Sequence, residues 1–405
     1  MSTCLDCRDW RRVGCAVLVL AALCWSSRPT HGDEPTADEP TVDEPTVDEP
    51  TVDELATDEL AALLAQQLEG YLQERPKSGV IVGVSVHGER RYFAFGCFDD
   101  AAPDERPDEH TIYEIASITK TLTALTLATL VVDHQVALED RLPTVLPEDL
   151  AVSADLQSVT LEQLATHRSG LPRLPVNMLV DAFTHADNPY AAYSVDRLRA
   201  MLPLTATVPL SRGQPAYSNF GMGLLGEALA MQQQTTFREL VQRQVLDPLQ
   251  LSETFIDVPD EAAARFIAAR TPAGELCPHW DFLALAGAGA IRSTAADMLS
   301  FLEANIQPPD SPLGEAIELT HQLRWRQEGQ GMALAWHCDF PSEGDPVYWH
   351  NGGTGGFVSY AAFHRPSRTA VVLLSNSGDV ATGRTPTDRI GRKIHQRLIL
   401  GPSAP

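Results

Sequence analysis

The chain has 405 residues, 44% of them hydrophobic, and a formal net charge of −24. This length allows about two to three domains, and the composition is that of an ordinary globular enzyme. A chain this acidic, without a basic cluster, argues against binding to nucleic acid, which requires a basic patch.

Residues 1–32 have the layout of an export signal. Three arginines precede the apolar stretch 13–25, and Thr30 and Gly32 place small residues at the −3 and −1 positions of a cut after Gly32. The apolar stretch is short for a membrane span. We therefore expect an exported protein, periplasmic or extracellular and associated with the cell envelope. An uncleaved N-terminal membrane anchor is the alternative.

An acidic repeat at residues 33–57 follows the signal. Copies of Asp-Glu-Pro-Thr-Val fill this segment, and the Asp-Glu pairs from Asp33 to Glu59 account for half of the net charge. Such a segment cannot bury a core, so we predict an extended, solvated linker. A calcium-binding stalk is the alternative, and the absence of a glycine-bearing acidic loop disfavours it.

Four of the seven cysteines lie in the first 32 residues and would leave with a cleaved signal. The others, Cys97, Cys277 and Cys338, are an odd number and lack the close spacing of a metal site. We predict small buried thiols, no metal and no cofactor, and the sequence leaves one disulfide open.

Apolar patterns at both ends of the remaining chain predict one shared antiparallel sheet. Each end combines two strand-like runs with one helical pattern, while the sequence between them is rich in helical patterns. The predicted strands are residues 80–86, 91–95, 357–363 and 369–374, and the helices carry Leu60 to Leu72 and Ile390 to Leu398.

We therefore expect an α/β fold of the α+β type over residues 58–401. Residues 58–121 and 286–401 would form the antiparallel sheet with its flanking terminal helices. Residues 122–285 would form an inserted all-helical domain.

Ser117 and Lys120 are three residues apart at the start of the apolar run 122–132. At this spacing both side chains lie on one face of a helix, whose N-terminal dipole points at the serine. A lysine whose charge is disfavoured by burial could accept the serine proton. The S-x-x-K spacing alone is weak, because chance also produces it.

Two further segments could complete such a site. Tyr217 and Asn219 lie in a turn, where a phenol near a cation could ionise and act as a base. The glycine-rich segment 348–357 could supply backbone N–H groups to an oxyanion, and it lacks the order of a phosphate loop. Each segment also has a simpler interpretation when it is taken alone. Tyr217 could be a structural tyrosine and Asn219 a helix cap, and the segment 348–357 could be a glycine-rich turn leading into an edge strand.

His167, in the loop 166–172, is a tempting triad histidine. The chain contains no G-x-S-x-G nucleophile elbow for it to serve. We therefore interpret the loop as a wall of a cleft and His167 as structural.

The ordered set Ser117-x-x-Lys120, Tyr217-x-Asn219 and His350-Asn351-Gly352 resembles the serine hydrolases related to class C β-lactamases and D-Ala-D-Ala carboxypeptidases. The resemblance covers about residues 60–398. Thr166-His167-Arg168-Ser169-Gly170-Leu171-Pro172 is similar to the T-H-x-S-G-L-P loop of this family, and the stretches 246–249 and 286–298 also agree with it.

The resemblance implies a fold with an α/β part beside an all-helical part, and no metal or cofactor. It implies that Ser117 is acylated and that Lys120 and Tyr217 share its proton. Asn219 would position the substrate amide, and the backbone N–H groups of Ser117 and Gly353 would form the oxyanion hole.

His350 stands where this family often has the lysine of K-T-G, and Asn351 and Gly352 complete that motif. Histidine is mostly neutral near pH 7 and lacks the permanent positive charge of that lysine. Asn351 stands in place of the threonine of K-T-G, so its hydroxyl is also missing. We therefore expect weaker binding of a substrate carboxylate. We expect hydrolysis of a small molecule or peptide: a β-lactam, a D-amino-acid peptide or a small ester. A penicillin-binding sensor that does not turn over is the alternative, as is a structural surface protein with a vestigial site.

Overall fold

The computed structural model describes residues 57–97, 105–185, 187–210, 213–340, 344–378 and 386–400. The predicted export signal, and all but the last residue of the predicted linker, lie outside these residues. Within the described part, no helix has the length and apolar character needed to cross a bilayer. Within the same described residues, Cys97, Cys277 and Cys338 form no disulfide; Cys338 is buried and the other two are half-buried.

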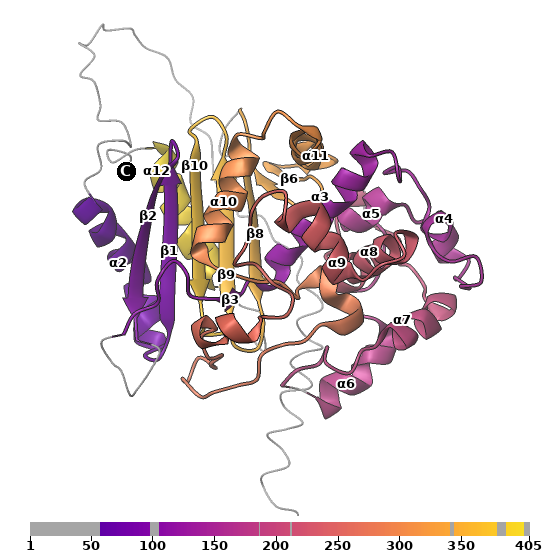
Figure 1. The fold of residues 1–405 in the computed structure, drawn as a ribbon, viewed down its shortest axis with the longest axis horizontal. Coiled ribbons are helices and arrows are strands. Elements are labelled where there is room, and N and C mark those ends of the chain that lie inside the picture. Colours follow the sequence, from indigo (N-terminus) through magenta and orange to yellow (C-terminus); the bar gives the residue numbers. More distant parts are fainter. Residues whose placement is uncertain are drawn as a thin grey trace, which may run out of the picture.

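An eight-stranded antiparallel sheet forms the centre of the α/β part (Figure 1). Its order is β2-β1-β10-β9-β8-β7-β6-β5, so the first hairpin of the chain pairs with the last strand. This confirms the prediction of a sheet built from both chain ends. The strands are β1 (Gly79–Val86), β2 (Glu89–Gly96), β5 (Trp325–Gln327), β6 (Gln330–Met332), β7 (His337–Asp339), β8 (Val347–Gly353), β9 (Val358–His364) and β10 (Thr369–Ser375).

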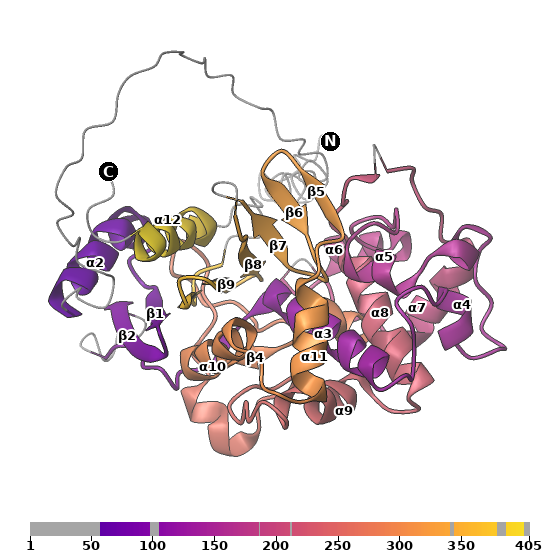
Figure 2. The same cartoon turned by 90° about the horizontal axis from the view of Figure 1, so that it is seen from above.

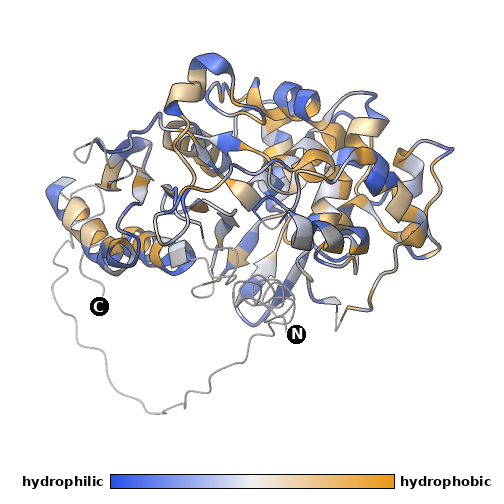
Figure 3. Ribbon diagram, turned by 90° about the horizontal axis from the view of Figure 1, so that it is seen from below, coloured by the Kyte–Doolittle hydropathy of each residue, from blue (hydrophilic) through white to orange (hydrophobic). Residues whose placement is uncertain are grey.

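Two terminal helices, α2 (Thr57–Glu74) and α12 (Pro386–Leu400), cover one face of the sheet (Figure 2). Their apolar residues recur every four positions and pack together with the sheet in one core. Figure 3 shows both hydrophilic and hydrophobic residues along the helices beside the C-terminal end, as expected for such amphipathic helices. The residues that these helices contribute to the core are Leu60, Leu64, Leu68, Tyr71, Ile390, Ile394 and Leu398.

On the opposite face lies α10 (Ala295–Ile306), and beyond it lies the helical part of the molecule (Figure 2). Both belong to a second, larger core. The other α-helices are α3 (Thr119–Val132), α4 (Leu142–Val145), α5 (Leu161–Ala165), α6 (Leu179–Thr184), α7 (Val195–Met201), α8 (Asn219–Gln232), α9 (Phe237–Val241) and α11 (Pro312–His321). Short 3-10 or π turns and a two-stranded ladder of β3 (Tyr113–Glu114) with β4 (Arg292–Ser293) complete the described elements.

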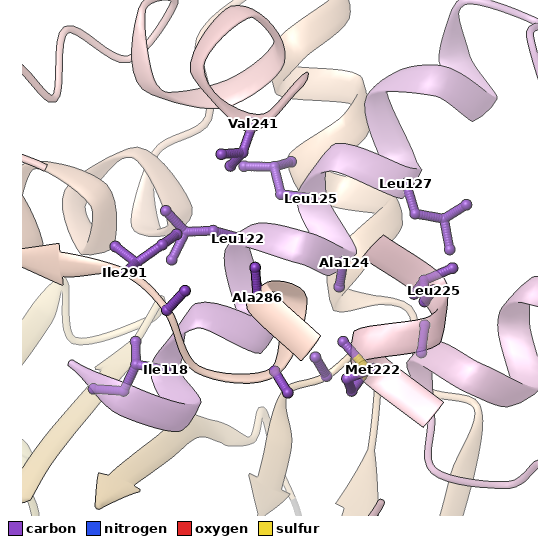
Figure 4. Close-up of a cluster of buried hydrophobic side chains, with 14 of the residues drawn as sticks. Ile118, Leu122, Ala124, Leu125, Leu127, Met222, Leu225, Val241, Ala286 and Ile291 are labelled. Atoms are coloured by element: carbon purple, nitrogen blue, oxygen red, sulfur yellow. The ribbon is translucent and has the colours of Figure 1, made fainter. Parts of the chain in front are cut away.

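Helix α3 runs through the middle of the larger core. Its first twelve residues are all buried, and Figure 4 shows Leu122, Leu125 and Leu127 among side chains from neighbouring elements. Buried threonines satisfy their hydroxyls within the helix, as when Thr126 Oγ1 donates to the carbonyl of Leu122 at 2.9 Å. The start of α3 is therefore held in a dry environment.

The glycine-rich segment differs from its predicted place. It was expected as a turn leading into an edge strand, but Gly352 and Gly353 lie within β8, and only residues 354–357 form the turn. Strand β8 lies between β7 and β9. Because β7 pairs with β8 only as far as Trp349, residues 350–353 have a strand partner on the β9 side alone.

Candidate active site

Ser117 lies in a single 3-10 turn, η2 (Ala116–Ile118), directly before α3. The preceding Ala116 has φ = 48°, in the left-handed region that alanine rarely adopts. Such a conformation costs about 1–3 kcal/mol and persists only where surrounding contacts hold it. One such contact is the bond from Ser359 Oγ on β9 to the carbonyl of Ile115, 2.9 Å long. The sheet therefore helps to hold the turn that presents Ser117.

Lys120, in the first turn of α3, is fully buried, and its Nζ is 2.9 Å from Ser117 Oγ. The same Nζ donates to the carbonyl of Ala288 at 2.7 Å. Burial, and secondarily the charge of Arg173, lower the pKa of Lys120 well below its usual value. A neutral amine keeps two N–H donors and one lone pair. It can thus donate to Ala288 and accept the proton of Ser117.

Tyr217 packs between two basic side chains. Its ring centroid is 4.8 Å from Lys120 Nζ and 5.1 Å from the guanidinium carbon of Arg173. Burial raises its pKa to about 12, although Arg173 and a hydrogen bond with Ser117 act in the opposite direction. The expectation that a nearby cation would let this phenol ionise is therefore wrong, because desolvation outweighs the attraction. Tyr217 stays protonated at neutral pH.

Asn219 is the first residue of α8 and is buried beside Tyr190. Its Nδ2 donates to the Tyr190 hydroxyl at 2.7 Å, and its Oδ1 has no hydrogen-bond partner in the described part of the chain. The Tyr190 ring packs against Phe282 and Trp280, with centroids 4.4 Å and 5.4 Å away. These three aromatic residues were missed by the sequence analysis, because no motif connects residues 190 and 280.

Strand β8 approaches the Ser117 turn through Gly352. A Cβ at Gly352 would lie 2.2 Å from the carbonyl oxygen of Ile115 and 2.3 Å from Ser359 Oγ. Only glycine allows the strand and the turn to come this close. Gly352 is therefore required because the space between β8 and the Ser117 turn has no room for a side chain.

Gly353 directs its backbone N–H away from β9. The N–H of Thr354 donates to the carbonyl of Phe357 at 2.9 Å, which makes 354 and 357 a hydrogen-bonded pair. Such pairs alternate with non-hydrogen-bonded pairs along an antiparallel ladder, so Gly353 and Val358 form a non-bonded pair. The Gly353 N–H therefore points to the side where β7 has ended.

His350 is fully buried, 6.3 Å from Tyr217 between ring centroids. Its Nδ1 donates to the carbonyl of Asn351 at 2.6 Å, which leaves a lone pair on Nε2, an atom without a partner among the described residues. Burial, and then the proximity of His337 and Lys120, lower the pKa of His350 well below 6.5. His350 is therefore a neutral acceptor.

His337 on β7 lies 5.1 Å from His350 between centroids and stacks on Trp349 at 4.5 Å. Burial lowers its pKa to about 4. The sequence carried no signal for this histidine, because it comes from a three-residue strand outside every motif.

Asn351 does not join the other predicted residues. Its Nδ2 donates to Asp388 on α12 at 2.7 Å. Successive side chains in a strand point to opposite faces, so His350 faces the site and Asn351 faces the terminal helices. The expectation that the Asn351 side chain contacts substrate is not met by this geometry.

The loop 166–173 is bonded to the segment that carries Tyr217. Four hydrogen bonds join the two segments: Ala216 N donates to His167 O, Ser218 N to His167 Nδ1, Ser218 Oγ to Pro172 O, and Phe220 N to Arg173 O. His167 is buried, and its ring is tilted against that of Tyr217 with centroids 4.5 Å apart. Its Nδ1 accepts from Ser218 N and burial lowers its pKa, so it is neutral and supports the tyrosine. Arg173 directly follows the T-H-x-S-G-L-P-like segment 166–172, and no sequence motif indicated a role for it.

The structure thus gathers Ser117, Lys120, Tyr217, His350 and the Gly352-Gly353 backbone around one point, with Asn219 next to Tyr217 on α8. The described residues contain no cluster of histidine, cysteine and carboxylate groups fit to hold a metal.

Known proteins are similar to this chain in sequence and in fold. Residues 64–395 match the Beta-lactamase family model. A beta-lactamase of Pseudomonas fluorescens is 26% identical over 76% of this chain and 91% of its own length. The D-alanyl-D-alanine-carboxypeptidase/endopeptidase AmpH of Escherichia coli K12 is 26% identical over 69% of this chain and 74% of its own.

A crystal structure of a beta-lactamase/D-alanine carboxypeptidase from Pseudomonas syringae superposes with a TM-score of 0.72. It is 21% identical and covers 85% of this chain and 99% of its own, so it supports the same fold. The family match extends over most of the chain and includes every motif described above. The chain therefore belongs to the beta-lactamase family of serine hydrolases.

Proposed function

We propose that this protein is an exported serine hydrolase that forms an acyl-enzyme at Ser117. The observation that carries the proposal is the fully buried Lys120, whose Nζ is 2.9 Å from Ser117 Oγ and whose ammonium form is disfavoured by burial. A serine hydroxyl becomes a nucleophile when an adjacent base removes its proton. The neutral amine of Lys120 is that base.

Tyr217 carries the proton onward. As Ser117 Oγ attacks the substrate carbonyl, Lys120 takes its proton, and the phenol, which remains protonated, donates its own proton to the leaving nitrogen or oxygen. The lysine then restores the proton of the phenol. One bond forms at Ser117 and one breaks at the leaving group, so the step is balanced within these three residues.

The oxyanion of the tetrahedral intermediate is held by the backbone N–H groups of Ser117 and Gly353. The orientation of the Gly353 N–H, away from β9, supports this role. Each such donor is worth about 3 kcal/mol in transition-state stabilisation. Asn219, beside Tyr217, positions the amide of the substrate.

The substrate is an amide or ester of the β-lactam, D-amino-acid peptide or small-ester class. Two of the relatives are named for β-lactam and D-alanyl-D-alanine substrates, which supports the first two classes. The neutral His350 offers no permanent charge to a substrate and so widens the range toward uncharged esters.

The test compares wild type with Ser117→Ala on a chromogenic cephalosporin, a short-chain nitrophenyl ester and a D-Ala-D-Ala peptide. We expect turnover of at least one substrate by wild type and none above background by Ser117→Ala, with mass spectrometry locating the acyl adduct on Ser117. Equal rates for both proteins on every substrate would refute the mechanism. A stable penicillin adduct at Ser117 without release would instead identify a penicillin-binding sensor.

A further inference from the structure

Arg173 lies at the rim of the site and is exposed, with its guanidinium carbon 5.1 Å from the ring centroid of Tyr217. We propose that Arg173 is the anion anchor of this enzyme and binds a carboxylate of the substrate. The inference rests on the proposed function and narrows it, because preferred substrates then carry a negative charge near the scissile bond.

Arg173 has no acidic partner within the described residues, in a chain where acids greatly outnumber bases. Several other arginines of the described part pair with carboxylates. The paired arginines include Arg90 with Glu303, Arg197 with Asp181, Arg265 with Glu253, Arg365 with Glu318 and Arg392 with Asp339. A guanidinium left unpaired can offer its whole planar fork to a carboxylate ligand.

The backbone beneath Arg173 is held in place. Its own carbonyl accepts from Phe220 N at 3.1 Å, and the carbonyl of Pro172 accepts from Ser218 Oγ at 2.6 Å. Both donors, Ser218 and Phe220, lie within three residues after Tyr217 in the sequence. The position of Arg173 relative to Tyr217 is therefore fixed before any ligand binds, which lowers the entropy lost on binding.

Burial disfavours the charged form of the other basic groups of the site. Burial lowers the pKa of Lys120, His167 and His350 well below their usual values. The main charge acting on Lys120 comes from Arg173, and no carboxylate acts on it. Near pH 7 Arg173 therefore supplies the permanent positive charge at this site.

The distances fit a short substrate. Lys120 Nζ and the guanidinium of Arg173 both contact the ring of Tyr217, and Ser117 Oγ is one hydrogen bond from Lys120. These distances place Ser117 Oγ and the guanidinium carbon of Arg173 no more than about 13 Å apart, which an extended substrate of up to four residues can span at roughly 3.5 Å per residue. The carboxylate can then belong to the acyl group or to the leaving group.

Two matched substrate pairs test the anchor. Nitrophenyl hemisuccinate and nitrophenyl butyrate differ by a carboxylate on the acyl side, and a D-Ala-D-Ala peptide and its C-terminal amide differ on the leaving side. At a pH above the acid limb of both proteins, we expect kcat/KM of Arg173→Gln for the anionic member of at least one pair to fall about tenfold or more, through KM, and kcat/KM for the neutral member to change less than about twofold. Arg173→Lys should recover part of the loss. Arg243→Gln, an equal charge change at an exposed position in the π turn that directly follows α9, is the control and should behave as wild type. Equal losses on both members of each pair would overturn the proposal.

A binding experiment keeps the two proposals separable. In Ser117→Ala, which cannot turn substrate over, titration calorimetry with the peptide acid and the peptide amide measures affinity alone. We expect the acid to bind about tenfold more tightly, and Ser117→Ala combined with Arg173→Gln to lose that preference. Equal affinities for acid and amide would refute the anchor, while Ser117-dependent hydrolysis of nitrophenyl butyrate by wild type decides the proposed function independently.

Discussion

The site has two walls of different character. The strand wall, residues 350–353 of β8, contributes a neutral histidine, a glycine that permits close approach and a directed backbone N–H. The loop wall, residues 166–173, contributes a buried histidine that supports Tyr217 and an exposed, unpaired arginine. The strand wall therefore supplies geometry, and the loop wall supplies charge.

This division follows from the two kinds of backbone. A sheet ladder fixes distances, and a group on it can be placed against Ser117 with little freedom, whereas an irregular segment can expose a long cation at the rim. Here the loop wall is nevertheless pinned by bonds to residues 216–220. Both walls are preorganised, and we expect substitutions in the two walls to change the kinetics in different ways.

The largest effect should come from Lys120, which lies between the two walls. Lys120→Ala removes the base, and we expect kcat/KM to fall about a thousandfold on every substrate. Thermal unfolding should show a folded protein, because the change removes only the two hydrogen bonds of Lys120 Nζ, to the carbonyl of Ala288 and to Ser117 Oγ. Full activity in this variant would exclude Lys120 from the mechanism.

The strand wall should break at Gly352. In Gly352→Ala the new Cβ would lie 2.2 Å from the carbonyl of Ile115, so the Ser117 turn and β8 must separate. A displacement of this kind costs about a hundredfold in kcat, and we expect charged and neutral substrates to suffer alike.

The matched control for this change is Gly344→Ala, where no atom lies within 4 Å of the new Cβ. It should retain wild-type kinetics. If Gly352→Ala also does so, the close approach is not needed for catalysis.

The loop wall should also act on the pH profile. Arg173 helps to lower the pKa of Lys120, so Arg173→Gln raises that pKa. Because the base must be neutral, activity then disappears at a higher pH as the solution is acidified. We expect the acid limb of kcat/KM for nitrophenyl butyrate to move upward, and an unchanged limb would show that burial alone sets the pKa.

The smallest effect on activity should come from Asn351, whose side chain faces α12. Asn351→Ala should change kcat/KM less than about threefold while lowering the free energy of unfolding by about 1–3 kcal/mol, since Asp388 loses a donor. Chemical denaturation and kinetics on one preparation check both values. A raised KM with an unchanged free energy of unfolding would show instead that the side chain of Asn351 takes part in substrate binding.

The sequence predicted those parts of the fold that carry strong periodicity. The hairpin near residue 80, the strands near residues 360 and 370 and the last helix are long enough to show apolar patterns, and the structure has them. Strands β5 to β7 have three residues each, too few to display an alternation, so the sheet is wider than expected.

For the site, the order of the motifs identified most of the residues, but it did not predict the direction in which their side chains point. Ser117 and Lys120 could be paired from helical spacing, but the phase of β8, which turns Asn351 away, depends on its pairing with β9. Tyr190, His337 and Arg173 are neighbours of Tyr217 or His350 only in space. The raised pKa of Tyr217 also depends on burial, which no local pattern reveals.

The pairing of β1 with β10 has a consequence for how the chain folds. Val80 lies opposite Ser375, so a central contact of the sheet joins residues almost three hundred positions apart. Closing so long a loop is slow, and during synthesis β1 must wait with one unpaired edge until nearly the whole chain has emerged. A chain shortened before β10 would lose the strand that joins β1 to β9, so aggregation of such fragments is the expected hazard.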